Sequence, residues 1–309
     1  MVSRYYPFSR FLRKRFGAPV YKIPLDAGFS CPNRDGTIGR GGCAFCYNPS
    51  FGPFADRALP IDKQIAVWAS RLRRRHRNAV KFLAYLQNYT NTYGPPAQLE
   101  RIYDAALAHP DVIGLAIGTR PDCVPDPVLD LIESYAATRH VWLEYGLQSI
   151  HNRTLVRINR GHTAEQFMDA VCRTRGRGIF VCAHVILGLP GETPADAVAT
   201  ARALTELRLD GVKIHHLQVL RGTPLAAAYQ NGGLEVLAPA EYVRWVCDFL
   251  EHLGPRITIH RLVGDVLDGD LLVAPRWRLT KSEMLRRIER ELERRGTVQG
   301  SALTDRPPD

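Results

Sequence analysis

Long apolar segments are absent from this sequence of 309 residues. No run approaches the roughly 18 apolar residues that a membrane span requires. The first residues, MVSRYYPFSRFLRKRF, also lack the apolar stretch of a secretory signal. These absences predict a cytoplasmic protein that does not bind a membrane.

An even, regularly spaced set of cysteines is missing as well. The seven cysteines are odd in number and irregular in spacing, which argues against a disulfide framework. In a reducing cytoplasm, clustered cysteines more often bind metal or take part in chemistry. The sequence therefore directs attention to the places where its cysteines gather.

Basic residues are in excess. The 41 Lys and Arg against 31 Asp and Glu give a net charge of +10, which suits a polyanionic partner such as nucleic acid. A basic but merely solvated surface is the alternative interpretation. The basic N-terminal segment Arg10–Arg15 and the run Arg71–Arg77 are the segments predicted to contact phosphates. The second run is also expected at the end of a helix, where the helix dipole favours cations.

Apolar segments alternate along the chain with segments that carry helix start signals. Thr163 with Gln166, and Thr280 with Glu283, have capping-box spacing. Asp126 precedes a proline, as a capping residue often does. The alternation predicts an α/β fold with a parallel sheet, open or curled into a partial barrel. The predicted strands are Pro19–Asp26, Ala79–Leu86, Val112–Gly118, His140–Leu147, Ile179–Leu187 and Gly211–Leu220.

A change in composition near Asn231–Pro239 predicts a boundary after the sixth strand. Three segments are therefore expected: a basic N-terminal arm (1–18), a core (19–230) and a C-terminal extension (231–309) packed on the core. The extension is predicted to contain a helix near Glu241–Leu253, a strand over Arg256–Gly264 and a helix over Lys281–Arg295.

The segment from Ser30 to Cys46, SCPNRDGTIGRGGCAFC, places three of the cysteines in one glycine-rich loop. Because the loop follows the first predicted strand, it belongs at the carboxyl edge of the sheet, where α/β folds bind ligands. A structural zinc site needs four ligands, whereas three thiolates suit a four-iron cluster with one open iron. The spacing favours the cluster and leaves zinc as the alternative. Phe45, before the last cysteine, is placed to pack against a bound ring.

Several motifs along the chain resemble a known family. A three-cysteine loop after the first strand of a (βα)6 partial barrel resembles the radical S-adenosylmethionine (radical SAM) superfamily. The long first spacing is similar to the branch that contains the elongator catalytic subunit. A more detailed similarity is to the bacterial YhcC/YtqA-like family. It rests on LDAGFSCPNRDGTIGRGGCAFC, YLQNYTNTYGP, AIGTRPDCVPD, LEYGLQSIHNRTLVRINRGHT, HVILGLPGET and IHRLVGD, which run in order from about Leu25 to Asp265.

This resemblance implies a TIM-like partial barrel, a [4Fe-4S] cluster on Cys31, Cys43 and Cys46, and S-adenosylmethionine on the fourth iron. It also implies reduction by a one-electron donor such as flavodoxin or ferredoxin and formation of a 5′-deoxyadenosyl radical. The residues that match cofactor contacts of the family, or replace them here, are Phe45, Asn88, Tyr89, Gln148, Arg160 and His184. In place of the family's usual glycine-rich turn after the second strand, this chain has QNYTNT.

Other polar residues near the predicted strand ends are further candidates. Cys123 and Asp122 follow the third strand and are predicted as catalytic residues, with Cys123 as a hydrogen-atom donor or an anchor for an intermediate. Glu144 lies within an apolar strand, so we expect it to be buried beside a partner, for which Arg120 is the candidate. His215 and His216 should point to opposite faces of a strand, so only one should border a cavity.

The leading hypothesis from the sequence is an enzyme of radical SAM chemistry that modifies the side chain of a wobble uridine in tRNA, as elongator-like relatives do. One alternative is a radical SAM enzyme acting on a small molecule or a protein side chain. Another is a non-catalytic, zinc-stabilised nucleic-acid-binding protein. The sequence carries no signal for an oligomeric state.

Overall fold

The computed structural model describes residues 3–47, 58–264 and 269–303. Asp265, the last residue of the quoted motif IHRLVGD, lies outside these ranges. No helix within them is both long enough and apolar enough to cross a membrane.

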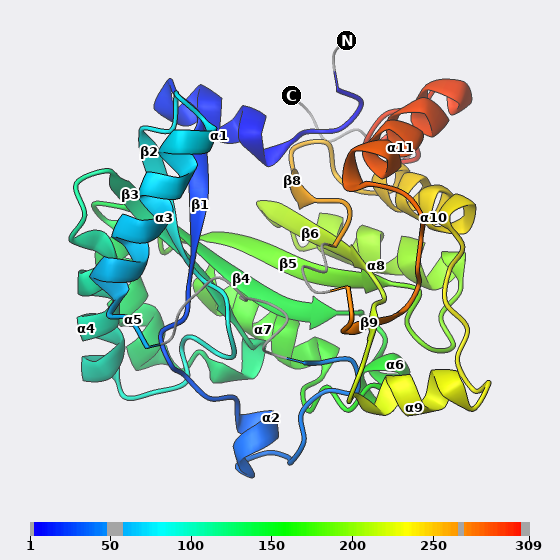
Figure 1. Ribbon diagram of the computed structural model, residues 1–309, viewed down its shortest axis with the longest axis horizontal. Coiled ribbons are helices and arrows are strands. Elements are labelled where there is room, and N and C mark those ends of the chain that lie inside the picture. Colours follow the sequence, from blue (N-terminus) through cyan, green and yellow to red (C-terminus); the bar gives the residue numbers. More distant parts are fainter. Residues whose placement is uncertain (1–2, 48–57, 265–268, 304–309) are drawn as a thin grey trace.

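A curled sheet of parallel strands forms the centre of the protein (Figure 1). Within the described residues it has seven strands in the order β1-β2-β3-β4-β5-β6-β8, and each neighbouring pair is parallel. The predicted α/β partial barrel is confirmed, and a strand from the C-terminal segment adds to the six expected. The strands are β1 (Val20–Leu25), β2 (Lys81–Leu86), β3 (Val112–Thr119), β4 (His140–Gln148), β5 (Phe180–Leu187), β6 (Gly211–His216) and β8 (Thr258–Arg261).

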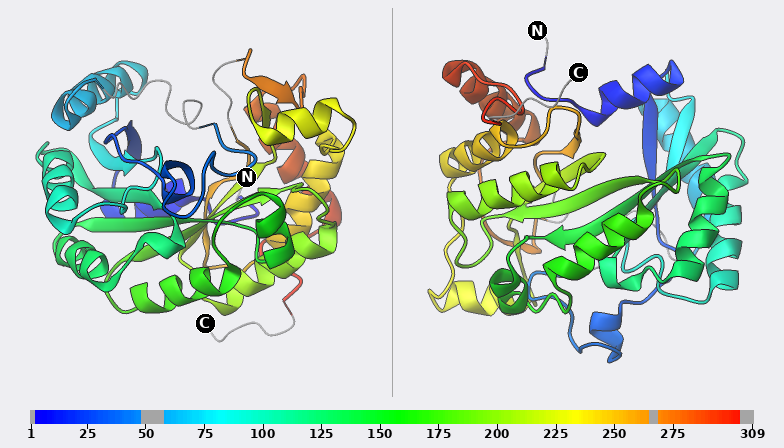
Figure 2. Two further views of the ribbon diagram at one scale, coloured as in Figure 1. Left: turned by 90° about the horizontal axis from the view of Figure 1, so that it is seen from below. Right: turned by 180° about the vertical axis from the view of Figure 1, so that it is seen from behind.

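Helices cover the outer face of this half-barrel (Figure 2). Most of them bury apolar side chains against the strands in one large core, while α6 and α9 contribute to a second apolar cluster and α1 to a third. The capping boxes predicted at Thr163 and Thr280 are both present. The helices are α1 (Phe8–Phe16), α2 (Pro32–Asp35), α3 (Ile61–Arg75), α4 (Pro96–Leu107), α5 (Asp126–Ala136), α6 (Asn152–Arg157), α7 (Ala164–Thr174), α8 (Pro194–Glu206), α9 (Pro224–Gln230), α10 (Pro239–Glu251) and α11 (Lys281–Arg295).

Two local predictions are wrong. The sixth strand ends at His216, because the neighbouring strand β5 ends at Leu187 and offers no further pairing partner. The chain then forms β7 (Val219–Leu220), which pairs antiparallel with β9 (Leu272–Ala274) in a separate small sheet. Asp126 does not cap α5: it is the first helical residue, and its carboxylate pairs with Arg173 at 3.0 Å.

Helix α1 closes the end of the half-barrel where the strands begin, opposite to α2 and the cysteine loop (Figure 1). The Phe8 ring stacks on His260 with 3.7 Å between ring centroids and meets Trp142 edge-on at 5.1 Å. Leu12 joins the same buried cluster. The basic N-terminal segment is therefore a packed helix with its apolar side turned into the barrel.

We expect Phe8→Ala to lower the free energy of unfolding by about 3 kcal/mol, because it removes a buried ring and leaves a cavity beside Trp142 and His260. Arg10→Ala, an exposed change on the same helix, should alter it by no more than about 0.5 kcal/mol. Urea denaturation under anaerobic conditions measures both. Equal effects would show that α1 does not contribute to the core in this way.

Candidate active site

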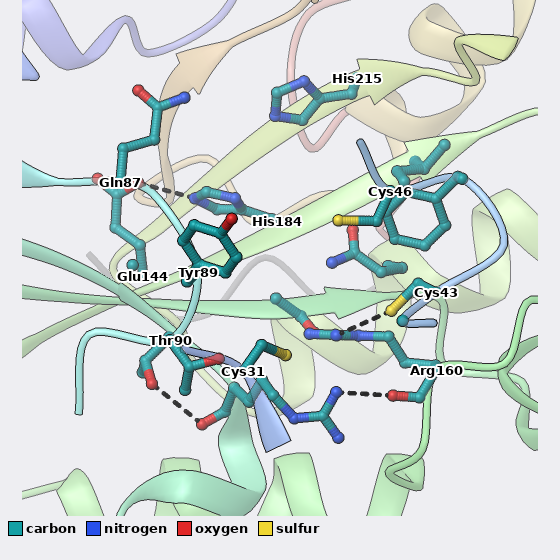
Figure 3. Close-up of a pocket in the computed structure, with 18 of the residues that line it drawn as sticks. Cys31, Cys43, Cys46, Gln87, Tyr89, Thr90, Glu144, Arg160, His184 and His215 are labelled. Atoms are coloured by element: carbon teal, nitrogen blue, oxygen red, sulfur yellow. Dashed lines mark hydrogen bonds and ion pairs between the residues drawn. The ribbon is translucent and has the colours of Figure 1, made fainter. Parts of the chain in front are cut away.

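One cavity opens at the carboxyl ends of the parallel strands. The cysteine loop forms one side of it, and the ends of strands β2 to β6 form the remainder. Figure 3 shows the side chains that project into it. The bordering residues are Cys31, Arg34, Gly42, Cys43, Phe45, Cys46, Tyr85, Gln87, Tyr89, Thr90, Gly118, Thr119, Arg120, Glu144, Gly146, Gln148, Arg160, His184, Ile186, Lys213, His215, His216, Leu217, Gln218 and Leu220.

The cysteine loop wraps closely around the short helix α2. Gly41 and Gly42 have positive φ angles of 83° and 85°, and a Cβ at Gly42 would lie 2.8 Å from Nε of Arg34. The Cys46 amide donates to the Cys43 carbonyl at 3.0 Å, so the C-x2-C segment is a tight turn. Glycine in this loop therefore lets the backbone approach the side chains that surround the thiols.

All three loop cysteines are free thiols that border the cavity (Figure 3). Burial, with a further contribution from Cys43, raises the pKa of Cys46 to about 11. Two side chains direct N–H groups at the Cys43 Sγ: Arg160 at 3.4 Å and Asn33 at 3.6 Å. A thiolate at Cys43 would therefore be stabilised by a cation and an amide.

A glycine in β4 makes room for Arg160. The Arg160 guanidinium donates two hydrogen bonds to the Gly146 carbonyl, at 2.6 and 3.2 Å. A Cβ at Gly146 would lie 2.6 Å from Arg160 Nη2 and 2.9 Å from Gln148 Nε2. Any other residue at this position would displace the arginine that contacts Cys43.

Most of the predicted cofactor contacts border the cavity. These are Phe45, Tyr89, Gln148, Arg160 and His184. Tyr89 and Gln148 have positive φ angles of 62° and 77°, which non-glycine residues adopt rarely and mainly at functional positions.

Asn88 is not among the described residues that border the cavity. Its Nδ2 donates to Asp26 at 2.7 Å, and the side chain is buried behind the cavity wall. The prediction that Asn88 contacts a cofactor therefore has no geometric support. The reason is that Tyr89, with its left-handed backbone, turns its own side chain toward the cavity instead.

The two predicted catalytic residues also lie outside the cavity wall as the structure describes it. Asp122 pairs with Arg120 through two hydrogen bonds of 2.9 and 2.8 Å. Cys123 is buried next to it in a single 3-10 turn, and burial raises the pKa of its thiol to about 12. Arg120 itself borders the cavity and donates to the Arg160 carbonyl at 2.8 Å. The geometry thus supports a positioning function for Asp122, through Arg120, and none for Cys123.

Glu144 is completely buried, as predicted, but the prediction that Arg120 is its partner is wrong. The carboxylate contacts Lys22 and accepts from His184 Nε2 at 2.7 Å, with Lys213 Nζ at 3.5 Å and His260 Nδ1 at 3.7 Å. Arg120 is engaged by Asp122, whereas Glu144 points into the barrel interior. Although burial opposes ionisation, the two lysines hold the pKa of Glu144 well below its usual range.

Sequence reasoning missed the lysines of this cluster. Lys213 lies in the apolar strand GVKIHHL, where a buried charge is as unusual as Glu144 is in its own strand. It is also two residues from His215, so both side chains share one face. His216 borders the cavity too, which corrects the prediction that only one histidine would, but its ring packs against Trp277 at 4.3 Å.

The predicted phosphate contacts lie at the wrong end of the barrel for this cavity. Helix α1, which contains Arg10–Arg15, covers the starts of the strands (Figure 1). Helix α3 ends at Arg75, directly before β2 begins, so Arg71–Arg77 also lies at that end, as a helix terminus. The basic charge that faces the cavity comes from other arginines.

Comparisons with known proteins agree with this architecture. The chain matches the Radical SAM superfamily over residues 35–204 and the Radical SAM C-terminal domain over residues 209–294. It is 41% identical to the uncharacterized protein YtqA of Bacillus subtilis over 299 residues, which cover 96% of this chain and 92% of the relative. It is also 41% identical to protein YhcC of Escherichia coli K12 over 293 residues, 94% of this chain and 93% of the relative. The chain belongs to the radical SAM superfamily.

More distant similarities cover less of the sequence. The tRNA uridine(34) acetyltransferase of Dehalococcoides mccartyi is 27% identical over 157 residues, 50% of this chain and 34% of that protein. Among solved structures, the archaeal Elp3 of Methanocaldococcus infernus superposes with a TM-score of 0.69 at 17% identity. That superposition covers 91% of this chain and 64% of the other, and it establishes the shared fold.

Family membership implies a [4Fe-4S] cluster and S-adenosylmethionine as cofactors, and it sets aside the zinc-stabilised binding protein. The cysteine end of the cavity fits such a cluster, because three free thiols border it with Arg34 and Arg160 beside them. Among the described residues, no group of three His, Cys, Asp or Glu side chains is arranged to hold a single metal ion. In a cluster each thiolate binds a different iron, so its ligands need not converge on one point.

We expect anaerobically purified protein to contain about four irons and four sulfides per chain. Replacing Cys31, Cys43 or Cys46 with Ala should abolish this content, because each thiolate holds one iron. Cys182→Ala, at a buried position of the barrel interior, is the control and should retain the cluster. Iron and sulfide analysis, together with visible absorption, measures the cluster content of each variant. Stoichiometric zinc without iron would contradict the assignment.

Proposed function

We propose that this radical SAM enzyme modifies the side chain of the wobble uridine of a tRNA. The supporting observation is the similarity of half the chain to a tRNA uridine(34) acetyltransferase, whose name specifies that nucleotide. An open cavity at the ends of the strands suits a loop nucleotide that can be splayed out of its stack and inserted. The net charge of +10 agrees with an RNA partner.

The residues proposed to hold S-adenosylmethionine border the same cavity as the thiols. Phe45 offers an aromatic face next to Cys46, and Gln148 and Arg160 offer N–H donors from β4 and the segment after α6. When bound and reduced, the cluster and S-adenosylmethionine supply a carbon radical that removes a hydrogen atom from the substrate. The chain's own residues bind and orient the cofactor and exclude water around it.

Exposed arginines on the cavity side of the barrel are the proposed phosphate contacts. Arg40 belongs to the cysteine loop, and Arg153 and Arg157 lie on α6, which directly follows the carboxyl end of β4. Arg157 is held by the Pro190 carbonyl at 3.1 Å, so its charge is fixed on this side. The cysteine loop and α6 lie toward one end of the barrel, whereas α1 lies at the opposite end (Figure 1).

We expect Gln148→Ala to weaken binding of S-adenosylmethionine roughly tenfold, a typical cost of losing a hydrogen bond to a charged ligand. The variant should retain the visible spectrum of the cluster, since Gln148 does not contact a cysteine in the structure. Equilibrium dialysis of the reconstituted protein measures the affinity. Asn88→Ala is the matched control, because Asn88 lies behind the cavity wall, and unchanged affinity in Gln148→Ala would refute the assignment.

The substrate is tested by incubating total tRNA with reconstituted enzyme, reductant and S-adenosylmethionine, followed by mass analysis of its nucleosides. We expect one uridine-derived nucleoside to change in mass, together with faster release of 5′-deoxyadenosine than without tRNA. No change in any nucleoside, with faster release caused by a small molecule or a protein instead, would favour the other substrate classes.

Two paired variants test how the tRNA binds. Arg40→Ala with Arg157→Ala should reduce the dependence of affinity on salt by roughly 0.7 to 0.9 log unit per log unit for each lost phosphate contact. Arg10→Ala with Arg13→Ala removes the same charge from the opposite end of the barrel and should leave that slope unchanged. The reverse result would show that RNA binds at α1.

A further inference from the structure

The cavity has two chemically different ends. Cys43 and Cys46 lie on one side of it, and Glu144 and His184 lie on the other (Figure 3). We call Tyr85, Glu144, His184 and Lys213 the cavity floor; all four border the cavity. The strand register pairs Lys213 with His184. Both lie two residues closer to the carboxyl ends of the strands than the position that pairs with Glu144. The floor is thus separate from the residues that hold the cluster.

Positive charge exceeds negative charge at the cavity floor. Glu144 is the carboxylate there, and Lys22 and Lys213 both contact it. Among the described residues, Lys22 and Lys213 share the one carboxylate of Glu144, so a bound anion beside Lys213 would be favoured.

Hydrogen-bonding capacity also remains at the cavity floor. The Lys213 ammonium has three donors, of which one serves Tyr85 Oη at 2.6 Å and a second points toward Glu144 at 3.5 Å. His184 donates its Nε2 proton to ionised Glu144, which leaves Nδ1 for the cavity side. Within the described chain, Nδ1 has no partner. Both side chains can therefore engage a group that enters from the opening.

We propose that Lys213 and His184 form the binding site for an anionic group of the substrate, a carboxylate or a phosphoryl group. Lys213 supplies the charge, and His184, which Glu144 holds through Nε2, borders the bound group. The proposal rests on the proposed function in that it names a group of the substrate taken by the same cavity. It assigns Lys213 as a specificity-determining residue.

The groups that surround Lys213 make its charge sensitive to pH. Burial is the main cause that lowers its pKa to about 7; Glu144 opposes this, and Arg261 and Lys22 add to it. The groups that act on Lys213 are Lys22 from β1, Tyr85 from β2, Glu144 from β4, Cys182 and His184 from β5, His215 from β6 itself and Arg261 from β8. Anion affinity should therefore fall as pH rises through about 7, as Lys213 loses its proton.

The test measures calorimetric binding of sulfate, malonate and neutral malonamide to cofactor-loaded protein. Sulfate represents a phosphoryl group and malonate a carboxylate. The anion that binds more tightly identifies which of the two groups the substrate carries. Lys213→Met should weaken anion binding about tenfold or more. Lys213→Arg should retain it and remove the pH dependence, because arginine stays charged.

Lys22→Met is the matched control, since Lys22 contacts Glu144 but is not among the described residues that border the cavity. It should lower anion affinity less than Lys213→Met does, because Lys213 borders the cavity and can contact the anion directly. Equal loss in Lys22→Met and Lys213→Met, or anion binding that survives Lys213→Met, would overturn the proposal. Thermal unfolding of each variant identifies any that fail to fold, in which case Lys213→Arg and the pH profile decide.

The result is independent of the tRNA experiment. Anion binding that depends on Lys213, together with unchanged tRNA nucleosides, would uphold this site and refute the proposed function. A modified uridine without any Lys213-dependent anion binding would uphold the proposed function and refute this anion site.

Discussion

A single buried carboxylate connects most of the barrel. Glu144 on β4 is fully buried and contacts side chains from β1, β5, β6 and β8. Because an isolated buried charge is costly, the position of Glu144 requires these partners, and the partners require Glu144. The curl of the sheet, which brings β1 and β8 across from β4, is what allows this pairing. The interaction thus links the shape of the half-barrel to the charge on its floor.

Closure of the opposite end supports the same arrangement. Phe8 stacks on His260, and Leu12 packs in the same cluster. His260 also faces Glu144 at 3.7 Å. Apolar side chains from α1 therefore exclude water from one side of the ion cluster, while the other side faces the cavity. The side that faces the cavity, where Lys213 lies, is the side on which we propose that a substrate anion binds.

The cofactor end of the cavity is organised by a different principle. Three separate parts of the chain meet around the Cys43 thiol. Gly146 leaves room for the Arg160 guanidinium, and both Arg160 and Asn33 direct N–H groups at the Cys43 Sγ. This end therefore depends on the absence of a side chain at Gly146 and on N–H donors, rather than on a buried ion pair. The cavity consequently joins an end where three cysteine thiols lie with a floor where we propose that an anionic substrate group binds.

Local pattern was sufficient for much of this protein. Apolar runs at regular intervals predicted the parallel strands, capping residues predicted the starts of α7 and α11, and the loop Ser30–Cys46 predicted its own place at the carboxyl edge. The family resemblance, confirmed by the comparisons, implied the cluster cysteines and predicted cofactor contacts, most of which border the cavity. These features depend on sequence neighbours or on the direction of parallel strands, which local pattern encodes.

Other features depended on contacts between distant residues. Sequence reasoning gave Glu144 the wrong partner and missed Lys22 and Lys213, because strands that are far apart in the chain supply them. It placed Asp122 and Asn88 in the site, although pairing with Arg120 and with the distant Asp26 holds them outside the cavity wall. It also assigned RNA contacts to the basic residues of α1, whose position at the far end follows from the apolar face packed into the barrel. The sequence by itself determined the alternation of strands and helices and the family, whereas only the tertiary structure decided which charges meet, because the partners come together only when the sheet curls.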